Sequence, residues 1–277
     1  MTKSLTRIMA FLSERFGIDF SVRQNTILME KIQGRLKSLD FDDPDVYLDH
    51  LHANEDEVKR LLASLTINAS SFFRSPLTFE YLNQKTLPAI IAAKCKTGIR
   101  VWSAGCAMGE EAYSIAILLN DLFKKKEIFP EIHIFATDLS PQILEKAAKG
   151  IYRLDQVKNV KFGILSTYFE RQGNSFHLSD RIKKMVSFSV YDMMDSRTYV
   201  PPDSIFGNFD LILCRNLLIY FSIDKQKKIF SKLYKATGPN GTLVIGDSEA
   251  VPDEYMHQLV QDTPYCRIYR KPGSYQS

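Results

Sequence analysis

The stretch WSAGCAMGEEAYSIAILL, Trp102–Leu119, decides how this sequence is read. It begins at the end of an apolar run, turns at Gly105 and Gly109, and continues with the composition of a helix. A strand, a tight glycine turn and a helix start form the arrangement with which nucleotide-binding folds hold a phosphate. Here, however, Glu110 and Glu111 stand at the helix start, where a phosphate would be repelled.

On both sides of this stretch, short apolar segments alternate with helix-like segments. The predicted strands are 99–104, 131–138, 185–190, 209–214, 242–247 and 265–271, and the predicted helices are 109–126, 140–150 and 222–237. Strands that alternate with helices predict an α/β fold with a doubly wound, mostly parallel sheet. The last predicted strand, 265–271, is expected at an edge of that sheet.

The beginning of the chain has a different pattern. Apolar residues recur there at helical spacing, as at Leu28, Ile32, Leu36 and Leu39, and no strand pattern occurs. The sequence therefore predicts a small N-terminal all-helical domain with its linker over 1–80, and a sheet domain over 81–277. A Gly-Asn turn within 168–185 predicts a small β-hairpin inserted into the sheet domain.

The bulk composition excludes several classes. No apolar run approaches the roughly 20 residues that cross a bilayer, and no signal-peptide core is present, so we expect a cytoplasmic protein without membrane insertion. The four cysteines form no CxxC pair and the five histidines no cluster, so we expect no metal site. A net charge of +4 is too small to favour nucleic acid as a partner.

Basic residues are concentrated near the N-terminus. Arg23, Lys31, Arg35 and Lys37 precede a stretch, Asp40–Glu57, in which Lys and Arg are absent. A locally basic helical face suits an acidic partner, and the alternative is an ordinary solvated face.

The carboxylates of Glu110 and Glu111 make the glycine turn unsuitable for a phosphate and suitable for a positively charged ligand. At an effective dielectric constant of about 20, one carboxylate about 4 Å from a phosphate opposes binding by roughly 4 kcal/mol. S-adenosylmethionine has no phosphate, and its positively charged sulfur and its ammonium group would be attracted by Glu110. Gly105 would let the backbone approach such a ligand closely. The alternative is that Glu110 and Glu111 only complement the helix dipole.

Polar residues follow three other predicted strands. In an open α/β sheet, ligands bind beyond the carboxyl ends of the strands. Asp138 could accept both ribose hydroxyls of an adenosine, since Ser140 is better placed to cap the next helix. After the strand 185–190, Asp192 could accept from the adenine amino group, and Met193 could pack on the ring. The strand 209–214 is followed by Arg215 and Asn216, which suit the methionine part of the ligand.

Taken together, several motifs resemble the chemotaxis-receptor methyltransferase (CheR) family. They are NASSFFR (68–74), WSAGCAMGEEAYSIA (102–116), FATDLS (135–140), KGIYR (149–153) and FDLILCRNLLIYF (209–221). The resemblance covers nearly the whole chain in the right order. It implies a class I S-adenosylmethionine-dependent methyltransferase with a Rossmann-like sheet. The implied activity is O-methylation of glutamate side chains on bacterial chemoreceptors, with S-adenosylhomocysteine as the product.

The resemblance also implies roles for individual residues. It places cofactor contacts at Asn68, Ser70, Arg74, Glu110, Asp138, Asp192, Met193, Arg215 and Asn216. It places Arg74 and Tyr220 near the transferred methyl group, so these two are the predicted catalytic residues. The family usually has threonine, proline and histidine where this chain has Ser70, Ala112 and Asp247.

Partners and rival functions follow from the same resemblance. We expect the protein to be a monomer. Its expected partner is the cytoplasmic helical domain of methyl-accepting chemoreceptors. In some family members the inserted hairpin binds a receptor's C-terminal peptide by strand addition, and here the turn of the hairpin is short. The rivals are a methyltransferase with a nucleic-acid or small-molecule substrate, and a non-catalytic module that binds S-adenosylmethionine or a second messenger.

Overall fold

The computed structural model describes residues 2–16, 25–65, 70–94, 97–128, 130–204 and 206–273. The chain forms two compact units. One unit comprises Met1–Asn68 and Ile219–Gln226, and the other comprises Ala69–Leu218 and Lys227–Ser277. Within the described ranges, no helix is both long and apolar enough to cross a bilayer.

The smaller unit is helical, as the sequence predicts. Its helices are α1 (Thr2–Phe16), α2 (Asn25–Ser38), α3 (Pro44–Ala53) and α4 (Glu55–Leu65). Helix α1 packs on α3 and α2 packs on α4. Leu28, Ile32 and Leu36 of α2 are buried, whereas Leu39 is half-buried. The apolar stripe read from the sequence is therefore the core face of α2, and it weakens at its C-terminal end.

The larger unit is built on a sheet of seven strands in the order β6-β2-β1-β7-β8-β10-β9. The strands are β1 (Ile99–Ala104), β2 (Ile132–Asp138), β6 (Val186–Val190), β7 (Phe209–Cys214), β8 (Thr237–Ile245), β9 (Val260–Gln261) and β10 (Ile268–Arg270). All pairs among β1, β2, β6, β7 and β8 are parallel, and β10 is antiparallel to both of its neighbours. The predicted doubly wound α/β sheet is confirmed.

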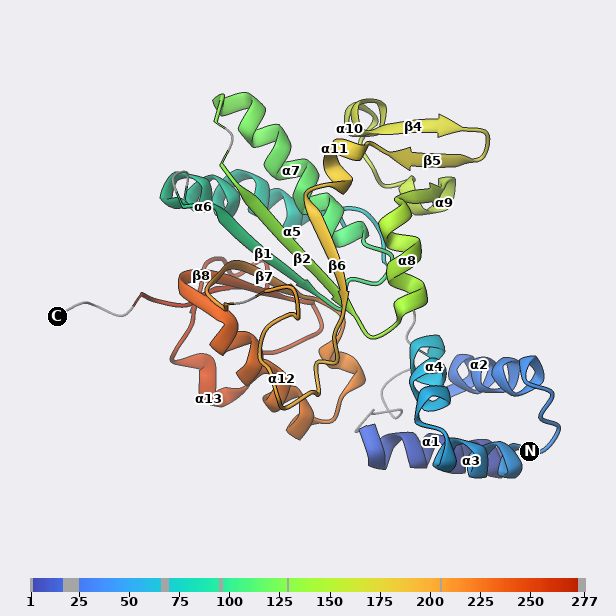
Figure 1. Ribbon diagram of the computed structural model, residues 1–277. Helices are drawn as coiled ribbons and strands as arrows, with labels where there is room; N and C mark the ends of the chain where they lie inside the picture. Colours follow the sequence, from blue (N-terminus) through green and yellow to red (C-terminus); the bar gives the residue numbers. More distant parts are fainter. Residues whose placement is uncertain are drawn as a thin grey trace. The chain divides into compact units, whose positions relative to one another are not determined.

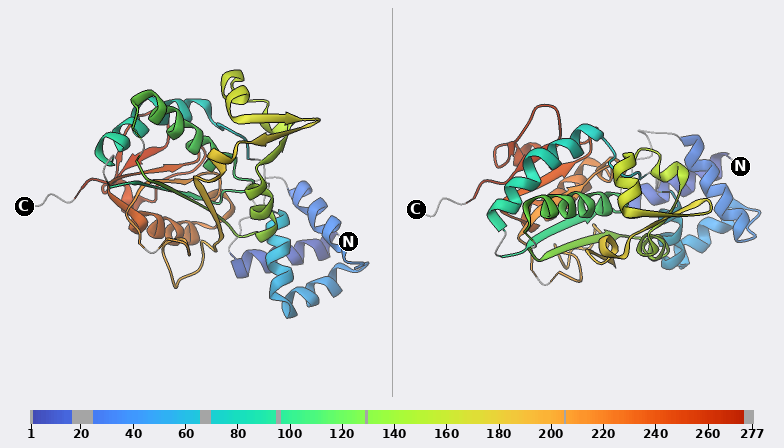
Figure 2. Two further views of the ribbon diagram at one scale, coloured as in Figure 1. Left: turned by 45° about the horizontal axis from the view of Figure 1, so that its top comes forward. Right: turned by 90° about the horizontal axis from the view of Figure 1, so that it is seen from above.

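Helices cover both faces of this sheet. Helices α6 (Leu87–Lys94) and α7 (Glu110–Lys126) lie on one face, and α12 (Ile223–Ala236) lies on the opposite face (Figures 1 and 2). Helix α8 (Pro141–Lys149) connects β2 with the inserted region and packs on β2 and β6. The remaining helical segments are α5 (Pro76–Tyr81), the π-helical η1 (Leu82–Thr86), the 3-10 helix η2 (Leu218–Tyr220) and α13 (Asp253–Met256).

Two helix starts and one helix end have residue types that such positions favour. Asp43 caps α3 by accepting from the N–H of Asp45 at 2.9 Å. Ser140 caps α8, because its hydroxyl accepts from the N–H of Ile143 at 3.4 Å. Gly150 ends α8 with φ +64, a left-handed conformation that glycine adopts without strain.

The inserted region is larger than the predicted hairpin over 168–185. Strands β4 (Phe169–Gln172) and β5 (Ser175–Leu178) form the hairpin (Figure 1). Strand β3 (Ile151–Arg153) pairs with β5, which makes a separate sheet of three strands. Short helices α9 (Leu154–Val157), α10 (Phe162–Tyr168) and α11 (Asp180–Lys183) complete it. A strand of three residues has too few alternating positions to be recognised in a sequence.

Two other expectations need correction. The expected edge strand, β10, lies between β8 and β9, because Val260–Gln261 adds a short strand outside it. The predicted domain boundary at about residue 80 lies instead at Asn68/Ala69. The reason is that Phe72 and Phe79 are buried in the core of the larger unit, so the predicted linker belongs to that unit.

Candidate active site

The candidate site lies where the sheet changes its winding direction. β1 is central, with β2 and β6 on one side and β7 and β8 on the other. The register places Ala104 beside Thr137, and Thr137 beside Ser189, so the strands end at a common edge. Crevices at such a point are where open α/β sheets bind their ligands. Most of the sequence-predicted residues of the larger unit follow these strand ends.

The turn after β1 is held against the end of β2. The N–H groups of Gly105 and Cys106 both donate to the carbonyl oxygen of Thr137, at 2.8 and 2.9 Å. Gly105 has φ +73, and a Cβ added to it would lie 3.2 Å from the side chain of Leu217. The position therefore needs glycine for two reasons, its backbone conformation and the close approach of the β7 loop.

Asp138, at the end of β2, fixes the same turn. Its carboxylate accepts from the N–H of Ala107 at 3.0 Å and from the N–H of Ser140 at 3.1 Å. Burial raises the pKa of Asp138, and these backbone N–H groups partly offset the increase. Asp138 thus shapes the turn, and its predicted bonds to ribose hydroxyls stay a prediction.

Glu110 is the most unusual group at this edge. The residue is 1% exposed, and its Oε2 atom has no hydrogen-bond partner among the described residues. The other oxygen, Oε1, lies 3.5 Å from the amide nitrogen of Gln156. Burial raises the pKa of Glu110, although its own backbone N–H, the Ser70 hydroxyl and Gln156 act in the opposite direction. A buried carboxylate without a cation is costly, and a positively charged ligand would remove that cost.

Glu111 has partners within the protein. Its Oε1 accepts from the Ser103 hydroxyl of β1 at 2.8 Å, and its Oε2 lies 3.4 Å from the Arg215 guanidinium after β7. The Arg215 side chain is 2% exposed and also donates to the Ser75 hydroxyl at 2.7 Å. These bonds tie β1, β7 and the segment before α5 together. Two guanidinium nitrogens of Arg215 thus make internal contacts, whereas its buried Nε atom has no hydrogen-bond partner among the described residues. Its predicted contact with the cofactor stays a prediction.

Arg74 lies in a strained turn. Its two neighbours, Phe73 and Ser75, have φ values of +53 and +61, which are uncommon for residues with a side chain. Such conformations cost of order 1–3 kcal/mol each and persist only where surrounding contacts impose them. Here the N–H of Phe73 donates to Ser114 at 3.0 Å, and the Ser75 hydroxyl donates to Asp247 at 2.6 Å. The turn leaves the Arg74 side chain exposed.

Strain recurs at the other loops of this edge. Ala107, in the turn after β1, has φ +48, and Asn216, in the loop after β7, has φ +57. The N–H of Asn216 donates to the Glu249 carboxylate at 3.1 Å, and Gly246 donates to the same oxygen at 2.6 Å. Glu249 thus joins the loops after β7 and β8. The sequence offered no signal for this role, because GDSE reads as an ordinary turn.

Asp192 and Met193 follow β6 as predicted. Asp192 is exposed and accepts from the N–H of Met194 at 2.8 Å, whereas Met193 is 7% exposed. An apolar side chain beside an exposed carboxylate suits an adenine ring with its amino group. Their contact with adenine stays a prediction.

The inserted region also contributes to the site, which the sequence reading missed. The Tyr152 hydroxyl of β3 donates to the carbonyl oxygen of Met108 at 2.8 Å, within the glycine turn. The amide nitrogen of Gln156, in α9, lies 3.5 Å from Oε1 of Glu110. The signal was the motif KGIYR, which the resemblance included without assigning it a role.

Two predicted site residues are not placed at this edge. Asn68 lies outside the described residues. Tyr220 ends η2, and its segment Ile219–Gln226 groups with the helical unit. The predicted roles of both residues stay predictions.

The predicted basic face has fewer free charges than expected. Arg23 lies outside the described residues. Arg35 donates to both oxygens of Glu57, at 2.8 and 2.7 Å, and Glu57 is 2% exposed. Lys31 is half-buried and donates to the carbonyl oxygen of Leu65 at 3.4 Å. Lys37 is exposed.

Comparison with known families gives two matches that together span most of the chain. Residues 68–266 match the family described as CheR methyltransferase, SAM binding domain. Residues 3–66 match the family described as CheR methyltransferase, all-alpha domain. The two matches meet near the boundary between the compact units. They confirm the resemblance drawn from the motifs.

Three curated relatives extend this result. The chain is 33% identical over 250 residues to the chemotaxis protein methyltransferase of Salmonella typhimurium, covering 88% of this chain and 82% of that protein. It is 30% identical over 253 residues to the chemotaxis protein methyltransferase of Borreliella burgdorferi, covering 89% and 88%. It is also 31% identical to an uncharacterized 104.1 kDa protein of Rhodobacter capsulatus, of which it spans only 26%.

Proposed function

Since this chain belongs to the CheR methyltransferase family, a family of S-adenosylmethionine-dependent protein methyltransferases, we propose that it forms methyl esters on glutamate side chains of bacterial chemoreceptors. The observation that supports this most directly is Glu110. At the start of α7, this buried carboxylate has an oxygen without a hydrogen-bond partner among the described residues, which suits a ligand with positive charge and opposes a phosphate.

The residues of the sheet edge fit the cofactor. The turn at Gly105 leaves backbone close to the ligand, and the Glu110 carboxylate would hold the ammonium group. In the proposal, Asp138 holds the ribose, Asp192 and Met193 hold the adenine, and the loop Arg215–Asn216 with Asn68 and Ser70 surrounds the methionine part. When bound, S-adenosylmethionine supplies an activated methyl group on a positively charged sulfur.

The substrate needs positioning rather than activation. A glutamate side chain has a pKa near 4.3 and is ionised at neutral pH, so no general base is required. Holding the reacting groups in line contributes about 7–11 kcal/mol in well-oriented systems. In the proposal, Arg74 orients a carboxylate through its bidentate guanidinium, and Tyr220 fixes the donor or the acceptor by a hydrogen bond. The strained turn around Arg74 supports such a role, since strain of this kind gathers at functional sites.

The proposed protein partner is the glutamate-rich helical domain of a chemoreceptor. An acidic coiled coil would be attracted by a basic helical face. With Arg35 paired to Glu57, the described residue that best serves this purpose is the exposed Lys37, and Lys31 is half-buried. Arg23 completes the proposed face.

The test is transfer of a radiolabelled methyl group from S-adenosylmethionine to receptor cytoplasmic fragments. We expect label that is released by mild base, as a glutamate methyl ester would be. Arg74→Ala should lower transfer by more than about 100-fold, while Arg267→Ala, a change at another exposed arginine of the same unit, should leave it unchanged. Near-normal transfer by Arg74→Ala would refute the proposed role of Arg74.

The rival without catalysis makes a different prediction. A module that only senses S-adenosylmethionine would bind it in calorimetry and transfer nothing to any receptor fragment. If a nucleic acid or a small molecule acquired the label while the receptor fragments did not, the result would instead support a different substrate class.

A further inference from the structure

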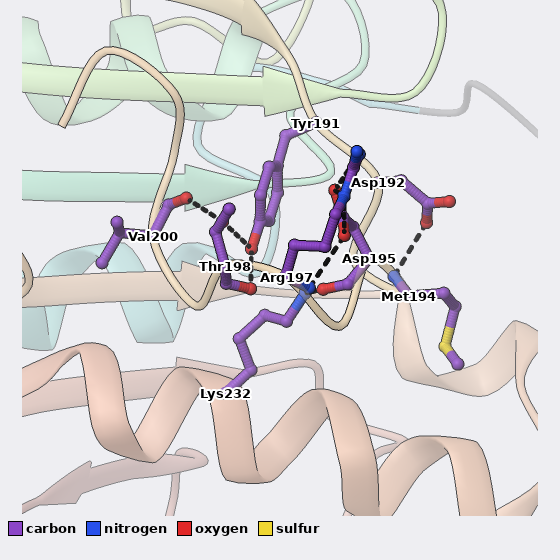
Figure 3. Close-up of polar contacts among 8 residues, drawn as sticks. All are labelled: Tyr191, Asp192, Met194, Asp195, Arg197, Thr198, Val200 and Lys232. Carbon is purple, nitrogen blue, oxygen red and sulfur yellow. Dashed lines mark hydrogen bonds and ion pairs between the residues drawn. The ribbon is translucent and has the colours of Figure 1, made fainter.

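The loop that follows β6 has a dense set of internal hydrogen bonds. The Tyr191 hydroxyl donates to the carbonyl oxygen of Thr198 at 3.0 Å, and the Thr198 hydroxyl donates to that of Val200 at 2.9 Å. At the start of the loop, the N–H of Asp195 donates to the carbonyl oxygen of Asp192 at 3.0 Å. Figure 3 shows these residues around the side chain of Tyr191. The loop that carries Asp192 and Met193 therefore has a defined conformation.

One contact to this loop comes from a helix that lies later in the chain. Lys232 of α12 extends its ammonium group to the carbonyl oxygen of Asp195, at 2.6 Å (Figure 3). The same nitrogen lies 4.8 Å from the centre of the Tyr191 ring, a cation–π distance. Lys232 is 8% exposed, although lysine is rarely buried in proteins.

The environment of Lys232 is acidic on the side of the loop. Burial lowers the pKa of Lys232, and the carboxylates of Asp192 and Asp195 act in the opposite direction. Asp195 is also paired with Arg197 at 2.8 Å, on the exposed side of the loop. Asp192 has no such basic partner among the residues described, so Lys232 is the buried positive charge that acts on it.

These contacts form a chain from α12 to the predicted adenine contact. Lys232 holds the carbonyl group of Asp195, the N–H of Asp195 holds the carbonyl group of Asp192, and the Asp192 carboxylate holds the N–H of Met194. Loss of the first contact would release the peptide that orients Asp192. A buried ammonium group that only filled space would be replaced at little cost by a methionine of similar length.

We propose that Lys232 is a positioning residue for cofactor selection: it holds the loop so that the Asp192 carboxylate accepts a hydrogen bond from the amino group of adenine. This inference rests on the proposed function, since it requires an adenosine ligand beyond β6. It adds a residue of α12 to the determinants of specificity.

The test compares two ligands that differ at one group. S-adenosylhomocysteine presents an amino group to Asp192, whereas S-inosylhomocysteine presents a carbonyl oxygen at the same position. Wild-type protein should bind the adenosyl compound at least about 10-fold more tightly in calorimetry, because a carboxylate accepts from an amino group and repels a carbonyl oxygen. Asp192→Asn should remove this preference, since an amide can donate as well as accept.

Lys232→Met should reduce the preference to about 2-fold or less, and Lys232→Arg should restore part of it. Lys271→Met is the matched control. Lys271 is also partly buried, donates to the carbonyl oxygens of Tyr234 and Thr237 at 2.9 and 2.8 Å, and lies 4.3 Å from the Tyr234 ring. Among the described residues, these side-chain contacts of Lys271 do not involve the β6 loop, so its removal should alter stability and leave the preference intact.

The outcomes separate the two claims. A full preference in Lys232→Met, with a stability loss like that of Lys271→Met, would overturn the role of Lys232. A full preference in Asp192→Asn would overturn the role of Asp192 and the inference with it. Wild-type protein that bound neither compound would overturn the proposed function itself.

Discussion

In the proposed complex, the protonation of Glu110 is coupled to cofactor binding. Burial raises the pKa of Glu110, so its neutral form is favoured more than in an ordinary glutamate. A raised carboxyl pKa contributes stability below the ordinary value of 4.5, and that contribution is lost as the pH rises through the raised value. At neutral pH an ionised Glu110 therefore lowers the stability of the free protein, and a positively charged ligand reverses this.

The corresponding prediction concerns Glu110→Gln. The variant should unfold at a higher denaturant concentration than wild type at pH 7, because it removes a buried charge, and it should bind S-adenosylmethionine more weakly. Wild-type affinity should fall as the pH is lowered through the raised pKa of Glu110, by at most about 10-fold per pH unit for one proton. Calorimetry at a series of falling pH values measures this slope, which should be flatter in Glu110→Gln. Equal slopes would contradict it.

Residue by residue, the sequence predicts the site only where chemistry is local. Local contacts explain the roles of Gly105, Asp138 and Ser140, because each acts within its own turn or helix cap. Their position at or directly after the end of a predicted strand is enough to predict them. The left-handed conformations of Phe73 and Ser75 could not be predicted, because they are imposed by contacts with distant residues, Ser114 and Asp247 among them.

At the scale of elements, α2 differs from its sequence-based reading. Arg35 was expected on a basic outer face, and it instead pairs with the buried Glu57 of α4, which also accepts from the Tyr47 hydroxyl of α3 at 2.8 Å. Burial acts to raise the pKa of Glu57, but the hydrogen bonds from Arg35 and Tyr47 outweigh it, so the pKa lies below its ordinary value. The three helices are joined by this ionic cluster, whose partners a helical pattern alone cannot reveal.

We therefore expect Arg35→Met to destabilise the helical unit by about 3 kcal/mol, because it leaves Glu57 buried without its cation. Arg7→Met breaks the exposed Arg7–Asp45 pair of the same unit and should cost at most about 1 kcal/mol. Hydrogen exchange in residues 28–65 of the full chain measures both. Because the pKa of Glu57 is lowered, the wild-type advantage should persist above the ordinary value of 4.5 and disappear as the pH falls below it. Equal effects of the two variants would argue against the cluster.

For the whole molecule, the fold class follows from the order of strands and helices, which needs only local patterns. The elements with the longest apolar runs, β1, β2, β7 and α7, lie where the sequence places them. The extent of the units was not predictable in the same way. It depends on where Phe72 and Phe79 are buried, and on Ile219–Gln226 joining the helical unit. Such long-range packing leaves no periodic signal.

The proposed association with a receptor depends on the charge distribution of the whole protein. With a net charge of +4, methyl transfer to an acidic receptor fragment should slow steeply as salt is raised from about 0.05 to 0.5 M. Lys37→Glu should slow transfer at low salt by about 10-fold and have little effect at high salt. Lys235→Glu, the same charge change at an exposed position of α12, is the control. Transfer rates that do not respond to salt would exclude electrostatic steering.

The division of the chain into units has a consequence for its synthesis. The helical unit contains two separate pieces, and in the second of them Lys225 donates to the carbonyl oxygen of Arg15 at 3.2 Å. Domains generally begin to fold while the ribosome is still translating. Proteolysis of stalled nascent chains, with and without Ile219–Gln226 emerged from the ribosome, should show α1–α4 gaining protection only in the longer ones. Helices α1–α4 should therefore complete their folding only after β7 has been translated, since Ile219–Gln226 of their unit follows that strand.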